Sequence, residues 1–133
     1  MLNVNELDHL VLNVDDIERS LNFYADGLGL STERLEEFQK GEVSFPSVRV
    51  NESTIIDLFP PALHPSVKTG GANLNHLCLV AGNTIEEIEA HLVTIGAPID
   101  RGPVRGFGAR GTGTSVYTRD PDGNAIEVRT YRE

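Results

Sequence analysis

Apolar and polar residues alternate along residues 7–14 (LDHLVLNV), which is the pattern of a strand with one buried face. The period then lengthens to that of a helix, whose apolar stripe is Ile17, Leu21, Tyr24 and Leu28. Asp15 or Asp16 can cap the start of this helix, and Gly27 and Gly29 can end it. The chain therefore opens with a predicted strand and a predicted helix.

Three extended segments are predicted next, at residues 32–38, 43–50 and 53–59. The first is rich in glutamate and gives a weak pattern, whereas the last (STIIDLF) is rich in β-branched and aromatic residues. Residues 60–73 then contain three prolines and two glycines and are predicted to form a linker. Residues 1–60 thus predict a module with the order strand, helix and three strands.

After the linker the same order of patterns begins again. Residues 74–81 (LNHLCLVA) predict a strand, and Thr84 with Glu87 forms a capping box for the next helix. The apolar stripe of this helix is Ile85, Ile88, Leu92 and Ile95, and the helix is expected to end at a glycine, Gly96. Extended segments are predicted at 97–101, 114–119 and 125–131, the last two joined by a hairpin turn with the sequence DPDGN.

The two halves match at nearly one offset, which indicates an internal duplication. LDHLVLNV overlays LNHLCLVA at an offset of 67, and Asp57 overlays Glu127 at an offset of 70. Chance similarity between strands is the alternative, but the matched polar residues disfavour it. We therefore expect a single α+β domain over residues 1–133, built of βαβββ modules at 1–60 and 73–133.

Each module places one histidine and one carboxylate on the same predicted sheet face, away from the helix. In the first module these are His9 and Asp57, and in the second they are His76 and Glu127. Two imidazoles with one or two carboxylates suit a divalent first-row metal and leave positions open for water or substrate. Taken singly, each residue has a simpler explanation: a strand histidine is more often structural, Asp57 can be satisfied by backbone, and Glu127 can pair with Arg129. The repetition of the pair favours a metal site.

The segment 101–113 (RGPVRGFGARGTG) is basic in an acidic protein and rich in glycine. Its backbone N–H groups and the side chains of Arg105 and Arg110 can bind a carboxylate or phosphate, which predicts an anion-binding lid. A solvated loop whose arginines offset nearby acids is the alternative. Tyr117 is a further candidate for lining the cavity. Cys78 lies on the predicted face of the second histidine and is expected to be a small buried apolar residue rather than a ligand.

Composition narrows the class of protein. A chain of 133 residues can bury one core without disulfides, and its single cysteine excludes an intrachain disulfide. A formal net charge of −9 disfavours nucleic-acid binding. No run approaches the roughly 20 apolar residues of a membrane helix, and the N-terminus has no secretory pattern, so we expect a cytoplasmic protein without membrane contact.

At these residues the sequence resembles the vicinal oxygen chelate superfamily, which includes glyoxalase I, extradiol dioxygenases, methylmalonyl-CoA epimerase, fosfomycin-resistance thiol transferases and bleomycin-binding proteins. DHLVLNVDDIERSLNFYADGLGL and NHLCLV resemble the opening segments of the family's two modules, and YTRDPDGNAIEV, the most specific piece, resembles its closing hairpin. The resemblance covers nearly the whole chain and is strongest to the glyoxalase-domain-containing branch. It implies paired βαβββ modules whose mixed sheets curve around a metal cavity.

The resemblance also assigns roles to residues. His9, His76 and Glu127 match the family's three usual metal ligands. Asp57 stands where glyoxalase I has glutamate, and its side chain is shorter by one methylene. The family implies one divalent ion per site (Fe, Ni, Zn, Mn or Co), which binds vicinal oxygens of a small substrate and stabilises an enolate, an oxyanion or a bound peroxide. Glu127 matches the carboxylate that also acts as the base in the isomerase branch.

Three functions follow from this resemblance. The first is a metal-dependent enzyme with lactoylglutathione-lyase-like lyase or isomerase chemistry on a small substrate with an anionic part. The second is an Fe(II) extradiol ring-cleavage dioxygenase, whose ligand set is two histidines and one carboxylate. The third is a non-catalytic drug-binding protein, as in bleomycin resistance, although such members lack the ligands retained here.

A homodimer is also implied, because most short members pair their chains and each module leaves sheet edges that need cover. The metal site can then form in two ways. It can form within one chain, or His9 and Asp57 of one chain can meet the second pair on its partner.

Overall fold

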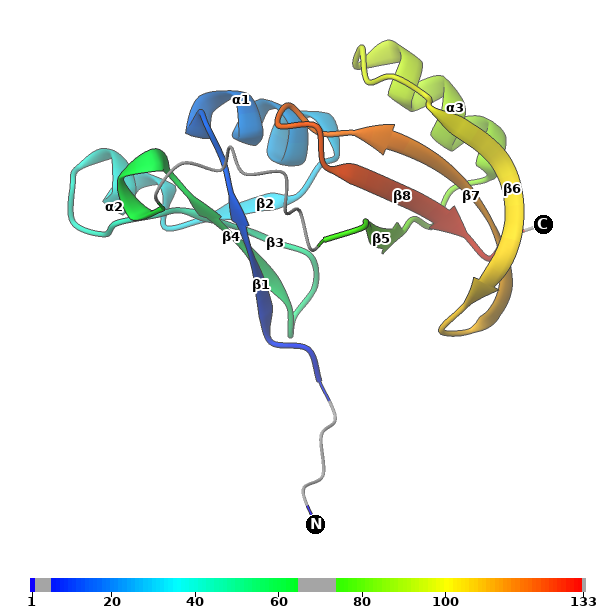
Figure 1. The fold of residues 1–133 in the computed structure, drawn as a ribbon, viewed down its shortest axis with the longest axis horizontal. Helices are drawn as coiled ribbons and strands as arrows, with labels where there is room; N and C mark the ends of the chain where they lie inside the picture. Colours follow the sequence, from blue (N-terminus) through cyan, green and yellow to red (C-terminus); the bar gives the residue numbers. More distant parts are fainter. Residues whose placement is uncertain (2–5, 65–73, 133) are drawn as a thin grey trace. The chain divides into compact units, whose positions relative to one another are not determined.

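The computed structural model describes residues 1, 6–64 and 74–132 and divides into two compact units, Met1–Gly70 and Gly71–Glu133. Each unit holds one four-stranded mixed sheet with helices, so the predicted α+β class is confirmed (Figure 1). Most of the predicted linker at 60–73 lies outside the described residues. Within its described part, Pro61–Leu63 forms a short 3-10 helix, η2. None of the helices in the described ranges is long and apolar enough to cross a membrane.

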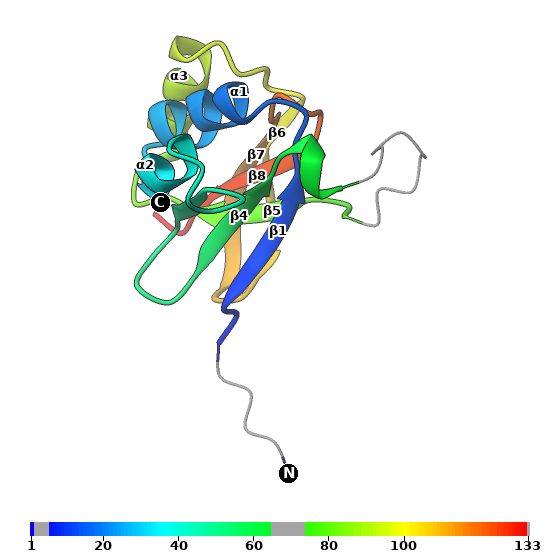
Figure 2. The same cartoon turned by 90° about the vertical axis from the view of Figure 1, so that its left-hand side faces the viewer.

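The first unit begins with β1 (His9–Asn13), α1 (Ile17–Leu21) and a π-helical turn, η1 (Asn22–Gly27). Its other elements are β2 (Ser31–Glu33), α2 (Leu35–Gln39), β3 (Ser47–Arg49) and β4 (Ile55–Phe59). The strand order is β1-β4-β3-β2, with β1 and β4 parallel and the other pairs antiparallel. Figure 2 shows β1 and β4 side by side. The first and last strands of the unit are therefore neighbours, which brings residues from its two ends together.

Burial in the first unit follows the predicted alternation. Leu12 and Val14 are buried, whereas His9 and Val11 are exposed. Asp16 caps α1 by accepting the N–H of Arg19 at 3.1 Å, and α1 packs on β4. The core consists of large apolar side chains that are almost fully buried: Leu12, Val14, Tyr24, Val48, Ile56 and Leu58. Burying each such side chain stabilises the fold by about 1.5–3 kcal/mol, and the opposite face of β1 stays open for the site.

The second unit repeats this plan. Its elements are β5 (Leu77–Val80), α3 (Ile85–Thr94), β6 (Arg101–Gly108), β7 (Gly111–Arg119) and β8 (Ala125–Thr130). The order is β5-β8-β7-β6, again with the first and last strands parallel and adjacent. α3 packs against β7 and β8 and begins at the predicted capping box.

Two local predictions at the ends of β7 and α3 are confirmed. The turn between β7 and β8 closes a hairpin in which the carboxylate of Asp120 accepts the N–H of Asp122 at 3.0 Å and of Asn124 at 2.8 Å. Gly96 follows α3 with a φ of +74°, a conformation that glycine adopts without steric cost.

The segment predicted to be extended at 32–38 is partly helical. Only its first residues belong to β2, and α2 follows. The reason is local: the sequence LEEFQ contains mostly strong helix formers, and Glu36 pairs with Lys40 one turn later at 2.9 Å.

The segment 101–113 is not a loop. It forms most of the long β6–β7 hairpin, with Arg105 opposite Thr114 and Phe107 opposite Thr112. Glycine is depleted in strands, so its frequency here obscured the strand pattern in the sequence.

Candidate functional site

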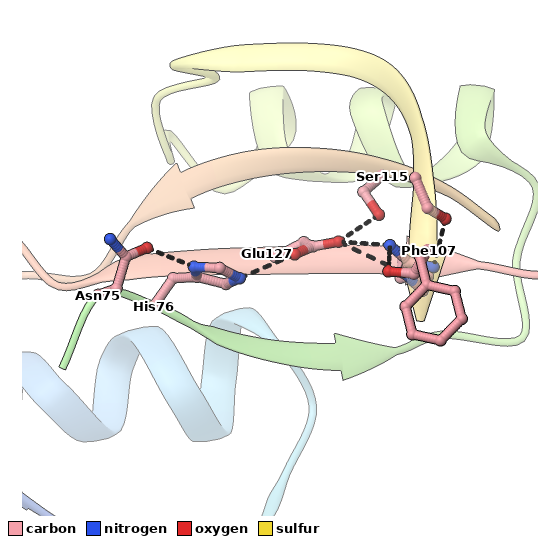
Figure 3. A network of polar contacts seen from close by, with 7 residues as sticks. Asn75, His76, Phe107, Ser115 and Glu127 are labelled. Carbon is pink, nitrogen blue, oxygen red and sulfur yellow. Dashed lines mark hydrogen bonds and ion pairs between the residues drawn. The ribbon is translucent and has the colours of Figure 1, made fainter. Parts of the chain in front are cut away.

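In the second unit an imidazole faces a buried carboxylate. His76 Nε2 lies 3.1 Å from Oε1 of Glu127, a β8 residue that is only 4% exposed (Figure 3). The other ring nitrogen, Nδ1, lies 2.6 Å from the side-chain oxygen of Asn75. A hydrogen bond at Nδ1 fixes the orientation of the ring and leaves Nε2 directed at the carboxylate.

The second oxygen of Glu127 is fully engaged. Oε2 accepts the hydroxyl of Ser115 at 2.6 Å and two N–H groups of Arg129, Nη2 at 3.1 Å and Nε at 3.3 Å. Burial pushes the pKa of Glu127 upward, but hydrogen bonds from Ser115, Tyr117 and Arg129 outweigh it and hold the pKa below its ordinary value. Glu127 is therefore a carboxylate at neutral pH, with Oε1 turned toward His76.

Arg129 belongs to this cluster, although its sequence position indicates only a possible pairing with Glu127. That pairing is present, together with hydrogen bonds from the guanidinium to the backbone oxygens of Gly106 at 3.0 Å and Phe107 at 3.1 Å. The side chain is 6% exposed. Period-two alternation along β8 predicts that Arg129 shares a sheet face with Glu127. It does not predict the hydrogen bonds of Arg129 to the hairpin, because these join residues that are distant in the sequence.

The glycines of the hairpin make room for Arg129 and Tyr131. A methyl group on Gly108 would overlap the guanidinium of Arg129 and lie 2.6 Å from the hydroxyl of Tyr131. One on Gly113 would lie 3.1 Å from Arg129 Nη1. The backbone carbonyls of the hairpin accept hydrogen bonds from the buried guanidinium of Arg129. Its glycines therefore let the backbone lie close to Arg129, which differs from the predicted lid whose N–H groups bind an anion.

Tyr117 and Cys78 lie beside Glu127. Both stand opposite it in the sheet, Tyr117 on β7 and Cys78 on β5, and the Tyr117 ring centroid is 5.6 Å from that of His76. Cys78 is exposed rather than buried, because β5 is an edge strand of its sheet and α3 covers the other face. Desolvation of the thiol, with a contribution from the Glu127 carboxylate, raises the pKa of Cys78 to about 11.

The first unit holds a similar but looser pair. His9 Nε2 lies 3.9 Å from Oδ2 of Asp57, and His9 Nδ1 lies 2.7 Å from the carboxylate of Asp8. That hydrogen bond raises the pKa of His9. Asp57 is buried, and its Oδ1 accepts the hydroxyl of Ser47 at 2.6 Å. The distance between His9 and Asp57 is longer than the 3.1 Å between His76 and Glu127, and the side chain of Asp57 is shorter than that of Glu127 by one methylene.

A cavity of about 290 Å³ opens beside this pair. It is lined by residues of the first unit alone: His9, Glu33, Arg34, Phe45, Ser47, Arg49, Ile55 and Asp57. Neither unit, in its described residues, groups three histidine, cysteine or acidic side chains closely enough to hold a metal by itself. Each unit thus contains one imidazole beside one buried carboxylate.

The two arginines expected to bind anions lie elsewhere on the second unit. Arg105 pairs with Thr114, which is three residues from Tyr117 on β7, so Arg105 stands on the sheet face opposite Glu127. Arg110 lies in the turn after β6, where its backbone N–H donates to the Tyr131 hydroxyl at 3.1 Å and its Cζ lies 5.5 Å from the centre of that ring.

Comparison with known proteins gives concordant matches. Residues 6–128 match the model of the Glyoxalase/Bleomycin resistance protein/Dioxygenase superfamily. The virulence protein STM3117 of Salmonella typhimurium is 33% identical over 96% of this chain and 85% of its own length. In an alignment with its crystal structure, the identity is 28% and the TM-score 0.80 over 98% of this chain and 100% of the other.

Two further relatives carry functional names. The glyoxalase domain-containing protein RDO1 of Mycosarcoma maydis is 33% identical over 99% of this chain and 72% of its own length. A lactoylglutathione lyase of Escherichia coli O157:H7 is 30% identical over 90% of this chain and 88% of its own length.

Proposed function

Because the chain belongs to the glyoxalase/bleomycin resistance protein/dioxygenase superfamily, we propose that it is a metal-dependent enzyme acting on a small molecule with two adjacent oxygen atoms. One observation carries the proposal. In each unit the Nε2 atom of a histidine at or just before the start of the first strand faces one oxygen of a buried carboxylate, while a serine hydroxyl donates to the other oxygen.

The residues fit a divalent first-row metal by their donor chemistry. His9, His76 and Glu127 would hold the ion, and Asp57 would add a weaker fourth contact because it is shorter. The Nδ1 atoms of both histidines are engaged by the preceding side chain, which leaves Nε2 as the available donor in each. Such outer contacts orient metal-binding imidazoles in many proteins.

When bound, a divalent ion supplies Lewis-acid polarisation of the substrate oxygens. The chain's own residues perform the other tasks. Ser115 and Arg129 fix one oxygen of Glu127 so that the other points to the site, and Tyr117 forms a wall beside His76. These contacts hold Glu127 and His76 of the second unit in place without a ligand, which limits the reorganisation that this pair needs on binding.

For the reaction we favour lyase or isomerase chemistry, as in the lactoylglutathione lyases among the relatives. Glu127 is then the general base, and it must use Oε1, since Oε2 already accepts three hydrogen bonds. The three hydrogen bonds to Oε2 also favour a second candidate, an Fe(II)-dependent ring-cleaving dioxygenase. In that reaction Glu127 would only bind the metal and would not also have to act as a base.

Metal titration tests the proposal. We expect purified protein, stripped with chelator, to bind about one Co²⁺ per site with d–d absorption bands, and His76→Ala or Glu127→Ala to abolish them. Asp57→Ala should weaken binding less. His91→Ala, which removes a histidine on α3, is the matched control. Equal Co²⁺ stoichiometry in wild type and both site variants would refute the proposed site, and no binding by wild type would favour a non-catalytic binding protein.

Substrate assays separate the two reactions. With the lyase, the hemithioacetal of methylglyoxal and glutathione is converted without consuming oxygen. Uptake of oxygen with a catechol, dependent on added Fe²⁺ and lost in Glu127→Ala, would instead establish the dioxygenase.

A further inference from the structure

The cavity of the first unit contains one arginine whose charge is not offset. Arg49 donates to Glu33 at 2.5 Å, so these two charges neutralise each other. Asp57 faces His9 and accepts a hydrogen bond from a serine. Arg34 forms no ion pair within the described residues, and its Nη2 donates only to the backbone oxygen of Phe45 at 3.1 Å.

The backbone at Arg34 is unusual. Its φ of 60° and ψ of 23° place it in the left-handed region, and it is the one non-glycine residue of the described segments with a positive φ. An L-residue other than glycine or asparagine pays roughly 1 kcal/mol for this conformation. Glycine would adopt this turn before α2 without that cost, so the backbone conformation alone does not favour an arginine here.

The guanidinium of Arg34 lies over the ring of Phe45. Its Cζ is 4.6 Å from the centre of the Phe45 ring, which also lines the cavity. The hydrogen bond to Phe45 uses one N–H of a group that has five N–H donors, and the contact with the ring uses none. The remaining donors can form the paired hydrogen bonds that a carboxylate prefers.

We propose that Arg34 binds the carboxylate of a small, flat organic anion whose apolar body lies along Phe45 and Ile55. The volume of about 290 Å³ lies at the lower end of small-molecule sites, which limits the ligand to about one ring or an equivalent unsaturated chain. The negative charge is attracted by Arg34 and repelled by Asp57, so the ligand's uncharged end faces His9. The inference rests on the proposed function, for which it names a substrate class, and it assigns the anion contact to the first unit instead of the β6–β7 hairpin.

The test uses benzoate and benzamide, which have the same shape but differ in charge. Both are titrated into ¹⁵N-labelled, metal-free protein, and binding is followed by the amide signals of Phe45, Ser47 and Ile55. We expect wild type to prefer benzoate about tenfold, the effect of one charge-assisted contact. Arg34→Met should abolish this preference, and Arg34→Lys should retain part of it.

Two further variants make the outcome decisive. Arg34→Gly removes the guanidinium while relieving the left-handed backbone, so it should fold at least as well as wild type and still lose the preference. Arg19→Met, which changes an exposed arginine on α1 of the same unit, should keep it. Equal affinity of wild type for both probes, no shift of the cavity signals, or a preference that survives in Arg34→Gly would overturn the proposal. Because the experiment contains no metal, its result is independent of the Co²⁺ titration.

Discussion

Arg129 contacts both the candidate site and the β6–β7 hairpin. Its guanidinium binds the carboxylate of Glu127 and two carbonyls of the hairpin, so it joins the site to the fold. A buried charge that loses its partner is costly because water cannot replace the lost contact. The stability of the second unit and the geometry of Glu127 should therefore depend on the same side chain.

Replacing Arg129 by Met should lower the free energy of unfolding by about 3 kcal/mol, since it leaves the Glu127 carboxylate buried without its cation. Urea denaturation followed by circular dichroism measures this. Arg119→Met is the matched control: Arg119 pairs with Asp100 at 2.6 Å on the surface, where removal should cost under about 1 kcal/mol. A similar loss for both variants would show that Arg129 is not the stronger anchor.

The pKa of Glu127 leads to an acid-dependent stability. Because the folded-state pKa lies below the ordinary value of 4.5, this group stabilises the fold above that pH, and the contribution is lost as the pH falls through the folded-state pKa. We expect the urea midpoint of wild type to fall on acidification below pH 4.5, and that of Glu127→Gln to fall less. Parallel curves for the two proteins would contradict this assignment.

At the scale of elements, the β6–β7 hairpin depends on its glycines. Gly108→Ala would place a methyl group against Arg129 and Tyr131, so we expect a loss of about 1–3 kcal/mol in unfolding free energy, typical of overpacking. Gly82→Ala is a suitable control, because a methyl group there would meet nothing within 4 Å. Equal stability of the two variants would mean that the side chains beneath the hairpin can move aside.

The sequence predicts correctly those elements whose structure is determined by neighbouring residues in the chain. α3 has a capping box and an apolar stripe, and the β7–β8 turn has an Asp-Pro-Asp-Gly-Asn sequence, so neither depends on distant partners. α2 was not predicted, because a helix of 5 residues is too short to show a clear periodic pattern of apolar side chains. The strands of the hairpin could not be predicted from local pattern, because the glycines at 108 and 113 leave space for Arg129, which is distant in the sequence.

The same distinction holds for the candidate site. Period-two alternation was enough to place each histidine on the face of its carboxylate. It could not reveal Ser115 and Ser47 as hydrogen-bond partners, because serine occurs in strands for many reasons. Nor could it single out Arg34, whose distinguishing features are a backbone angle and an absent ion pair.

For the whole molecule, the proposed ligand set draws on both units. Members of the superfamily typically act on small molecules and are often dimers, and we propose a homodimer here as well. The pairs His9 with Asp57 and His76 with Glu127 would then meet either within one chain or across two.

Mixing two inactive variants distinguishes these arrangements. If sites are shared, mixed dimers of His9→Ala and Glu127→Ala chains contain one intact site out of two, so Co²⁺ binding should return on mixing. If each site lies within one chain, every mixed dimer remains without metal. Sedimentation of the wild type as a monomer would refute the dimer itself.

The exposed thiol of Cys78 has a practical consequence for chemical labelling. It is the only cysteine in the sequence, and it stands opposite Glu127 in the parallel pair of β5 and β8. With a pKa of about 11 it is almost entirely protonated at neutral pH, so alkylating reagents should react slowly there. Under alkaline conditions one fluorophore or spin label can be attached to Cys78, beside Glu127, without introducing a new cysteine. A label at this position would report ligand binding at the candidate site.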